Sequence, residues 1–414
     1  MDIRIGAEPD QGKFANRPEF SPALKDRAAN RALYQKKRGT YVSEGTFICR
    51  RLRYNSQYRG LPDGSSAVTS MAASPDGVIY GATSGETAQV FAYNPRPPFD
   101  TVALLATLDG ETDCRRSLVW EKDGSVIVGT RCTGGRPKGW PGGALYRISG
   151  MPFYFDAVQE WPRGFGEVEK LAVPVAGEGI AALAIDRQCG RVYGLSDKTG
   201  ELFFYDLKTK KVEKRGSVDA MWHFSENLMI TPDGTLFTTA VGNRLVRFDP
   251  RIDSVKLLDE TVPSYPGRSL YARIDSWVWE PRSRLFYVGD KADGLLYTLD
   301  PRTLETRLLG KPADRIRVRA LAAAHDGRVF GMAGGVGDIG QVFVYEPESR
   351  QLRNLGIPLA AVEERHYGYE FDSAVTGRDG QIYFGESEWT SHLFVYFPSQ
   401  AAPRTEDDDD GIPF

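Results

Sequence analysis

A unit of one strand, a turn and an aromatic-rich strand recurs seven times along this chain of 414 residues. Successive turn residues lie 44 to 66 positions apart. Six of the seven are glycine, because two-residue hairpin turns favour a positive φ at this place. The seven turn residues are Gly77, Gly124, Gly190, Gly234, Ser283, Gly327 and Gly380.

Each unit continues with a third apolar strand, such as "QVFAYNP", "RLVRFDPR" or "HLFVYFP". In the first six units a fourth strand follows, for example "VKLLDET" or "LRNLGIP". Four short antiparallel strands in a unit of this length are typical of a β-propeller blade. The sequence therefore predicts an all-β fold, a seven-bladed β-propeller built from four-stranded antiparallel blades.

The two ends of the repeat region predict how the ring closes. The seventh unit has no fourth strand after "HLFVYFP", whereas a spare strand, "TFICRRLRY" (46–54), precedes the first unit. We expect this strand to complete the last blade, because the pairing removes an open sheet edge. The expected organisation is an N-terminal extension (1–45), the propeller (46–398) and an acidic C-terminal tail (399–414).

Charge and hydropathy bear on the partners and the location. The chain has 52 Lys and Arg residues against 55 Asp and Glu, a formal net charge of −3. This balance gives no electrostatic reason to expect nucleic acid or a membrane surface as a partner. No apolar run has the length of a membrane-spanning helix, and the N-terminus lacks the apolar core of a signal peptide. As written, the sequence predicts a cytoplasmic protein, or a periplasmic or secreted one if the chain is a trimmed form.

Aligning the innermost strands on their turn residues predicts a ring of charge at one end of the central channel. Seven positions before the turn the residues are mostly small, as expected where seven strands crowd an axis. One position earlier, five of seven residues are charged. These seven are Thr69, Arg116, Ala182, Glu226, Asp275, Arg319 and Asp372. Because isolated buried charges are costly, we expect ion pairs between blades, a ligand site, or both.

Other polar and aromatic residues are expected at the same end of the channel. Arg131 and Glu386 follow second strands of their blades. Tyr271, Arg273 and Tyr369 precede innermost strands. The approach segments also contain Trp222, His223 and His366.

These residue types suit an anionic sugar, such as a uronate-bearing oligosaccharide. Arginine binds carboxylates with two parallel hydrogen bonds, and Tyr or His can remove a proton next to a neutralised carboxylate. The predicted substrate-binding residues are Arg116, Arg131, Arg273, Arg319, Glu226, Asp275, Asp372, Glu386 and Trp222. The predicted catalytic acids or bases are His366, Tyr271, Tyr369 and His223.

Metal and disulfide chemistry have weaker support in the sequence. No HxH or HExxH motif is present, so no metal site is predicted from histidine, although Asp275, Asp372 and Glu226 could together hold a calcium or magnesium ion. Cys114 and Cys132 fall nearly opposite each other across the first hairpin of the second unit. Either a cross-strand disulfide or two packed thiols would fit this spacing.

The repeated wording "DGxIYGxT…xLFxYDP", seen in "SPDGVIYGATS" and "RLVRFDPR", resembles the seven-bladed propeller superfamily of YVTN-type, gluconolactonase-like and streptogramin-lyase-like proteins. It is also similar to propeller-fold polysaccharide lyases. Together with the charged ring, this resemblance implies a lyase-like or hydrolase-like enzyme that acts on an acidic oligosaccharide. The alternative is a non-catalytic propeller that serves as a scaffold or a ligand sensor. The oligomeric state stays open.

Overall fold

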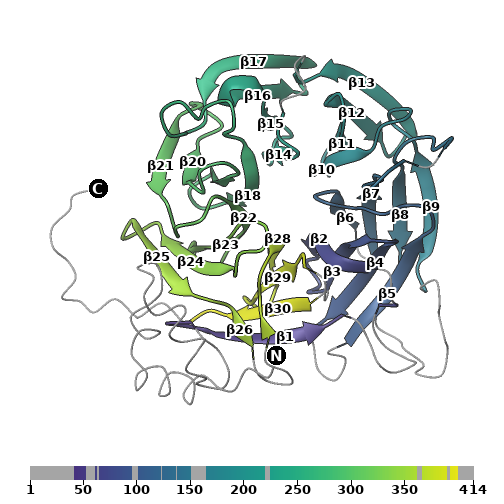
Figure 1. Cartoon of the computed structure of the whole chain (residues 1–414). Coiled ribbons are helices and arrows are strands. Elements are labelled where there is room, and N and C mark those ends of the chain that lie inside the picture. Colours follow the sequence, from purple (N-terminus) through teal and green to yellow (C-terminus); the bar gives the residue numbers. More distant parts are fainter. Residues whose placement is uncertain are drawn as a thin grey trace.

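The computed structural model shows seven four-stranded antiparallel sheets around a central axis (Figure 1). The predicted seven-bladed β-propeller is therefore confirmed. The one helical segment in the described part of the chain is a short 3-10 turn, η1 (Val241–Asn243). The structure describes residues 42–52, 61–62, 65–95, 101–122, 124–136, 138–150, 165–219, 224–360, 366–388 and 392–399.

The first four blades follow one another along the chain, each listed here from its innermost strand outward. Blade one contains β2 (Ser65–Ala73), β3 (Ile79–Gly85), β4 (Ala88–Asn94) and β5 (Thr101–Leu108). Blade two contains β6 (Leu118–Lys122), β7 (Ser125–Gly129), β8 (Leu145–Ser149) and β9 (Glu167–Ala172). Blade three contains β10 (Ile180–Asp186), β11 (Arg191–Ser196), β12 (Glu201–Asp206) and β13 (Lys211–Ser217). Blade four contains β14 (Met229–Ile230), β15 (Leu236–Thr239), β16 (Arg244–Asp249) and β17 (Ser254–Thr261).

The last three blades complete the ring. Blade five contains β18 (Ile274–Glu280), β19 (Leu285–Asp290), β20 (Leu296–Leu299) and β21 (Thr306–Gly310). Blade six contains β22 (Val318–Ala323), β23 (Val329–Ala333), β24 (Gln341–Glu346) and β25 (Gln351–Gly356). Blade seven contains β28 (Phe371–Thr376), β29 (Ile382–Glu386), β30 (His392–Phe397) and the N-terminal strand β1 (Thr46–Arg51). A separate two-stranded sheet pairs β26 (Leu359–Ala360) with β27 (His366–Tyr367).

The first hairpin of each blade turns through a residue with a positive φ. In six blades this is the predicted glycine, with φ between 67° and 95°. In blade five the sequence predicts Ser283, but Arg284 has the left-handed conformation, with φ 56°. The blade-five turn has the same length as that of blade three, with four residues between Glu280 and Leu285 and four between Asp186 and Arg191. Arg284, rather than Ser283, therefore has the place of Gly190. The predicted two-residue turn occurs in blade two, whereas four or five residues separate the paired strand ends in the other blades.

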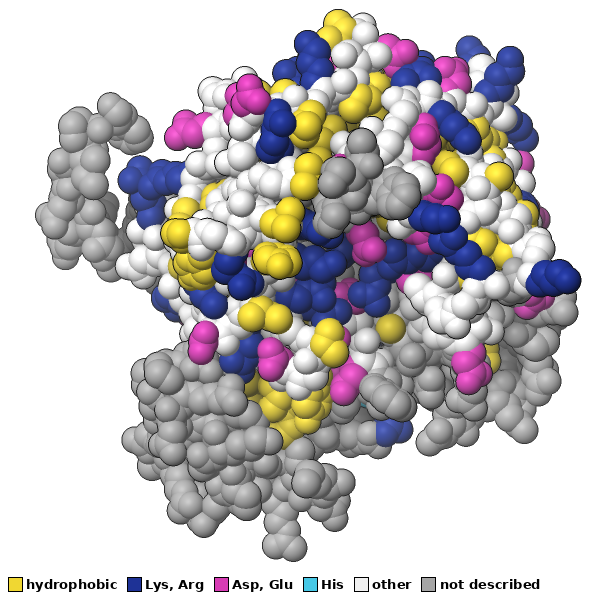
Figure 2. All heavy atoms as spheres, turned by 45° about the horizontal axis from the view of Figure 1, so that its top comes forward, with side chains coloured by type: hydrophobic (Ala, Val, Ile, Leu, Met, Phe, Trp, Pro, Cys, Tyr) yellow, Lys and Arg dark blue, Asp and Glu magenta, His cyan; other side chains and the backbone are white. Residues whose placement is uncertain are grey.

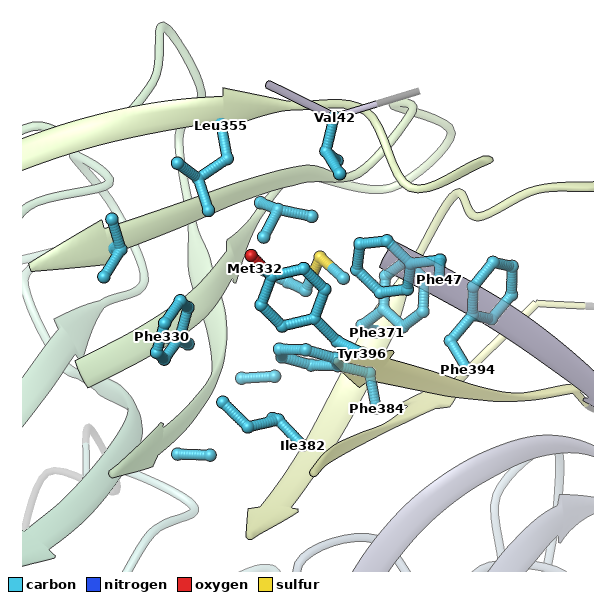
Figure 3. Packing of buried hydrophobic residues seen from close by; sticks show 14 of the residues in the cluster. Val42, Phe47, Phe330, Met332, Leu355, Phe371, Ile382, Phe384, Phe394 and Tyr396 are labelled. Carbon is cyan, nitrogen blue, oxygen red and sulfur yellow. The ribbon is translucent and has the colours of Figure 1, made fainter. Parts of the chain in front are cut away.

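The N-terminal strand closes the ring, as predicted. β1 pairs with β30 in an antiparallel register that runs from Thr46 opposite Phe397 to Arg51 opposite His392. Phe47 is fully buried, and its ring centroid lies 4.8 Å from that of Tyr396 and 6.1 Å from that of Phe394. Figure 3 shows Phe47 within an aromatic cluster between blades six and seven. The last blade therefore depends on a strand from the opposite end of the chain.

The innermost strands lie around the central axis (Figure 1), and residues of all seven blades line a channel along it. Their small polar residues connect neighbouring blades: Ser276 Oγ donates to Val318 O at 2.7 Å, and Ser373 Oγ donates to Val68 O at 3.3 Å. No helix in the described part of the chain is both long and apolar enough to cross a membrane. The fold thus leaves the channel, with its two ends, as the place where side chains from all blades meet.

Candidate functional site

The predicted charged ring forms a network of ion pairs where the innermost strands begin. Arg116 of blade two binds Asp275 of blade five, with 2.6 Å between nitrogen and oxygen. Arg319 of blade six binds Asp372 of blade seven through Nε, at 2.8 Å, and through a terminal nitrogen. Blades two and five are not neighbours in a ring of seven, so the first pair crosses the channel axis.

Two consecutive arginines precede the innermost strand of blade two and reach different blades. Arg115 lies 2.5 Å from Asp372, whereas Arg116 binds Asp275. Arg116 has a left-handed backbone with φ 56°, which is costly for any residue except glycine. This conformation breaks the alternation of an extended strand, in which neighbouring side chains point to opposite faces. Both arginines can therefore contribute to the network.

Asp372 and Asp275 are each fully buried and each bound by two arginines. Burial alone would raise the pKa of Asp372, but the Arg115 and Arg319 guanidinium groups hold it well below its usual range. Asp275 accepts two hydrogen bonds of 2.6 Å from Arg317 in addition to the bond from Arg116. These arginines likewise hold the pKa of Asp275 below its usual value against the effect of burial. Both carboxylates are thus ionised and fully engaged.

Glu226 is the more accessible carboxylate of the network. Its side chain is 34% exposed and lies 3.3 Å from Arg131 and 3.9 Å from Arg116. Although burial acts to raise the pKa of Glu226, these two arginines lower it overall. Arg131 also binds the buried Asp113 at 2.8 Å.

Cations outnumber carboxylates among the described residues of the network. The cations are Arg115, Arg116, Arg131, Lys291, Arg317 and Arg319. The carboxylates are Asp113, Glu226, Asp275, Glu370 and Asp372. Figure 2 shows a hollow near the centre of one face where Lys and Arg side chains gather, with Asp and Glu between them. The ion-paired arginines and carboxylates balance at five each, so the excess of one positive charge is that of Lys291, which forms no described ion pair and follows the buried Asp290.

Lys291 and Arg273 lie at this end of the channel without a described carboxylate within ion-pair distance. The backbone N–H of Lys291 donates to Arg273 O at 3.0 Å. Burial lowers the pKa of Lys291, and Glu226 and Asp275 partly offset that effect. Asp290, which directly precedes Lys291, is fully buried, and burial raises its pKa to about 6. Within the site, positive charge is therefore least neutralised around Lys291 and Arg273.

The remaining predicted site residues have different surroundings. Tyr271 is 60% exposed, and the Arg268 guanidinium lies 6.0 Å from the centre of its ring. Tyr369 is half-buried, and its backbone N–H donates to Glu386 at 3.4 Å. Glu386 is fully buried within blade seven, where it pairs with His392 Nδ1 at 2.8 Å. Glu386 therefore interacts with a partner inside its own blade.

Three predicted residues cannot be placed with the others. Trp222 and His223 lie outside the described residues. The backbone of His366 pairs with Ala360 in the small two-stranded sheet, but its side chain lies outside the described part of the structure. Their predicted roles therefore stay predictions.

The structure also adds network residues that the sequence alignment did not include. These are Asp113, Arg115, Lys291, Arg317 and Glu370. Asp113, Arg115, Arg317 and Glu370 lie within three residues of a predicted site residue in the sequence, so a wider window around the aligned positions would have included them. Lys291 lies 16 residues after the nearest one, Asp275, and such a window would have missed it.

The described residues form neither a metal-binding cluster nor a disulfide, and the calcium or magnesium ion stays a prediction. Arginines occupy the oxygens of Asp275 and Asp372, and no group of three or more His, Cys, Asp or Glu side chains described by the structure could hold a metal ion. Cys114 and Cys132 are free, buried thiols. Their neighbours Asp113 and Arg131 pair directly, which places the two cysteines diagonally rather than opposite each other.

Comparisons with known proteins identify the fold without a family. No protein-family model matches the chain, and no curated protein matches it in sequence. Among solved structures, 1102 chains match, so the fold is widely shared. A fold shared so widely does not by itself indicate a function.

Two of the similar solved structures are extracellular domains from B. thetaiotaomicron, described as parts of a hybrid two component system and of a one component system. Both have a TM-score of 0.53, with 12% and 13% sequence identity, and the match covers 81% and 83% of this chain. This chain spans about two fifths of their length, 39% and 40%. The protein U3-55K also has a TM-score of 0.53, at 11% identity, with 84% of this chain and 98% of that chain covered. At these identities the similarity concerns the propeller fold alone.

Proposed function

We propose that this propeller binds an acidic, uronate-containing oligosaccharide at the charged end of its channel. The observation that supports the proposal is the incomplete neutralisation around Lys291 and Arg273, next to the half-exposed Glu226. The buried arginines already bind protein carboxylates, so a ligand carboxylate would bind the cations that lack a partner. The exposed ring of Tyr271 supplies an aromatic surface near these cations, two residues before Arg273.

Cleavage of the bound sugar is the second part of the proposal. A lyase-like reaction needs a base that removes the proton next to a carboxylate whose charge has been neutralised. Tyr271 is the exposed candidate for this base, and Lys291 or Arg273 would neutralise the carboxylate. Ionised Tyr271 would take the proton from C5, the C4–O4 bond would break as a C4=C5 double bond forms, and Tyr271 would return the proton to the departing oxygen. The buried ion pairs would hold the blades in place and take no part in the chemistry.

A ligand sensor or scaffold without catalysis is the alternative. The similarity to extracellular domains of two component and one component systems favours this class by analogy of fold only. A sensor would use the same cations and would need no base.

Binding and cleavage can be separated in one set of experiments. We would titrate the full chain with oligogalacturonate and alginate oligosaccharides by calorimetry, with maltohexaose as a neutral control. Ultraviolet absorbance of an unsaturated uronate product would report cleavage. Binding of the acidic sugars alone, weakened by salt, would support a binder or sensor, whereas binding together with product would support the enzyme.

Variants test whether the named cations carry the binding. Lys291→Met and Arg273→Gln should each weaken binding about 10-fold, the loss expected for one hydrogen bond to a charged group. Lys208→Met is the matched control, because Lys208 is an exposed cation in a turn of blade three away from the network. Failure of every acidic oligosaccharide to bind, or equal affinity in the variants and the control, would refute the proposal.

A further inference from the structure

The channel widens below the charged network into a cavity of about 330 Å³. Its floor is formed by Arg116, Asp275, Arg319 and Asp372 of the network. Polar and apolar groups contribute about equally to its lining. The apolar side chains come from all seven blades. They include Met71, Leu118, Leu183, Leu228, Leu321 and Ala374. Trp120, Trp277 and Arg187 lie toward the end where the first hairpins turn.

The polar groups of the cavity wall already have protein partners. The hydroxyl groups of Ser276 and Ser373 donate to the backbone of neighbouring blades. Asn227 Nδ2 donates to Ile274 O at 3.0 Å. Pockets of this volume with apolar walls and a few polar groups are typical binding sites for small molecules.

Arg187 differs from the arginines of the floor because it has no described counter-ion. Its guanidinium stacks on the Trp120 ring at 4.6 Å from the ring centre. Two of its nitrogens donate to Trp120 O, at 3.1 and 2.6 Å. No carboxylate among the described residues lies within ion-pair distance of it. Arg187 is exposed at the surface, although partial burial of its side chain lowers its pKa. Three of its five N–H groups remain for another acceptor.

We propose that this cavity binds a small amphipathic carboxylate, with its apolar body between the leucine walls and its carboxylate at Arg187. The direction of binding follows from the charges. At the floor, Arg116 and Arg319 are paired with aspartates, whereas Arg187 at the other end has no ion-pair partner among the residues that the structure describes. The volume limits the ligand to about one or two fused rings or a short aliphatic chain. This site is independent of the proposed oligosaccharide site, which lies on the other side of the network.

The test uses a naphthalene probe with and without its charge. We would titrate the full chain with 2-naphthoate and with the neutral 2-naphthylmethanol by calorimetry. Quenching of tryptophan fluorescence provides a second readout, because Trp120 and Trp277 line the cavity. We expect one 2-naphthoate to bind per chain, more tightly than the alcohol.

Variants test where in the channel the probe binds. Arg187→Gln should weaken 2-naphthoate on the order of 10- to 100-fold and leave the alcohol nearly unchanged, because only the charge-assisted hydrogen bonds are lost. Arg284→Gln is the matched control, an exposed arginine of a first hairpin turn that also lacks a described carboxylate within ion-pair distance. Ala374→Leu and Ala72→Leu narrow the cavity from two blades and should weaken both probes.

The outcomes separate this site from nonspecific binding. Equal affinity of 2-naphthoate for Arg187→Gln and for the control would overturn the proposal, as would absence of binding to the unmodified chain. Binding that persists in well-folded Ala374→Leu and Ala72→Leu would place the probe outside the cavity and also overturn it. If the narrowed variants do not fold, as judged by circular dichroism, the Arg187→Gln comparison between charged and neutral probes decides alone.

Discussion

Replacement of Asp372 by Asn tests whether the network stabilises the ring. The Asp372 side chain is fully buried and accepts hydrogen bonds from Arg319 and Arg115. Arg319 is 3% exposed and Arg115 26% exposed, so loss of the carboxylate leaves one cation almost completely buried. The Asn side chain has nearly the same shape, so the change removes the charge with little effect on packing.

The expected loss of stability follows from these contacts. Each hydrogen bond to a charged group contributes about 1.5–3 kcal/mol, and removal of one member of a buried ion pair costs about 3–5 kcal/mol. Asn retains one oxygen that can accept from Arg319, and Arg319 keeps its 2.6 Å bond to Glu370. We therefore expect Asp372→Asn to lower the free energy of unfolding by about 3 kcal/mol.

The assay is urea unfolding at pH 7, followed by circular dichroism and tryptophan fluorescence. Asp253→Asn is the control, because Asp253 also lies 2.5 Å from an arginine, Arg215, but is 57% exposed. An exposed pair contributes about 0–1 kcal/mol, so the control should change stability little. Equal and small losses in the two variants would refute the view that the network is a stabilising connection between blades.

The same comparison has a defined pH dependence. The pKa of Asp372 is lower in the folded chain than in the unfolded chain, where it is about 3.9. Its contribution to stability is therefore complete above the unfolded pKa and is lost as the pH falls through the folded pKa. The difference between the unmodified chain and Asp372→Asn should be largest near pH 7 and should decrease below about pH 4. A difference that stays constant from pH 7 to pH 3 would contradict an ionised Asp372.

Two further perturbations test ring closure and the charged site. Phe47→Ala should lower the free energy of unfolding, measured in urea titrations, by about 3–5 kcal/mol. The reason is that it removes a fully buried ring packed on Tyr396 and Phe394 of the last blade. A loss below about 1 kcal/mol would mean that β1 contributes little to ring closure. Asp290 should titrate with a midpoint of about 6 in carbon-13 NMR, because burial raises its pKa. Because its pKa is raised, Asp290 stabilises the fold below the unfolded pKa of about 3.9, and this stabilisation is lost as the pH rises through about 6. Asp290→Asn should therefore reduce the loss of stability between these pH values. An Asp290 carboxyl that titrates near 4 would contradict the prediction.

The sequence predicts the fold because the information is local and repeated. Each blade shows its turn and its alternating strands within one stretch of chain, and the missing fourth strand of blade seven indicates ring closure. The turn residue of blade five is one position later than predicted, because its turn has the length of that in blade three and Arg284 has the place of Gly190. Without a glycine to mark this place, the repeat alignment assigned it to Ser283.

The charged ring could be predicted, but its pairing could not. Alignment places charges at one height along the axis, whereas the partner of each charge depends on which blades face each other across the channel. The bond between Arg116 and Asp275 joins blades three places apart. Arg115 joins the network next to a left-handed Arg116, a backbone state that strand periodicity cannot indicate. Glu386, predicted for the same rim, pairs with His392 inside blade seven.

The network also determines which charged residues a ligand can reach from each end of the channel. Arg116, Asp275, Arg319 and Asp372 form the floor of the channel cavity, so they separate that cavity from the end of the channel where Lys291 and Arg273 lie. Asp275 and Asp372 are each held by two arginines, and a ligand at that end would have to break those bonds to use them. Stability should therefore depend on Asp275 and Asp372, whereas ligand affinity should depend on the accessible Lys291 and Arg273. If Asp372→Asn weakens oligosaccharide binding more than Lys291→Met does, while both variants remain folded, this division between buried and accessible charges is wrong.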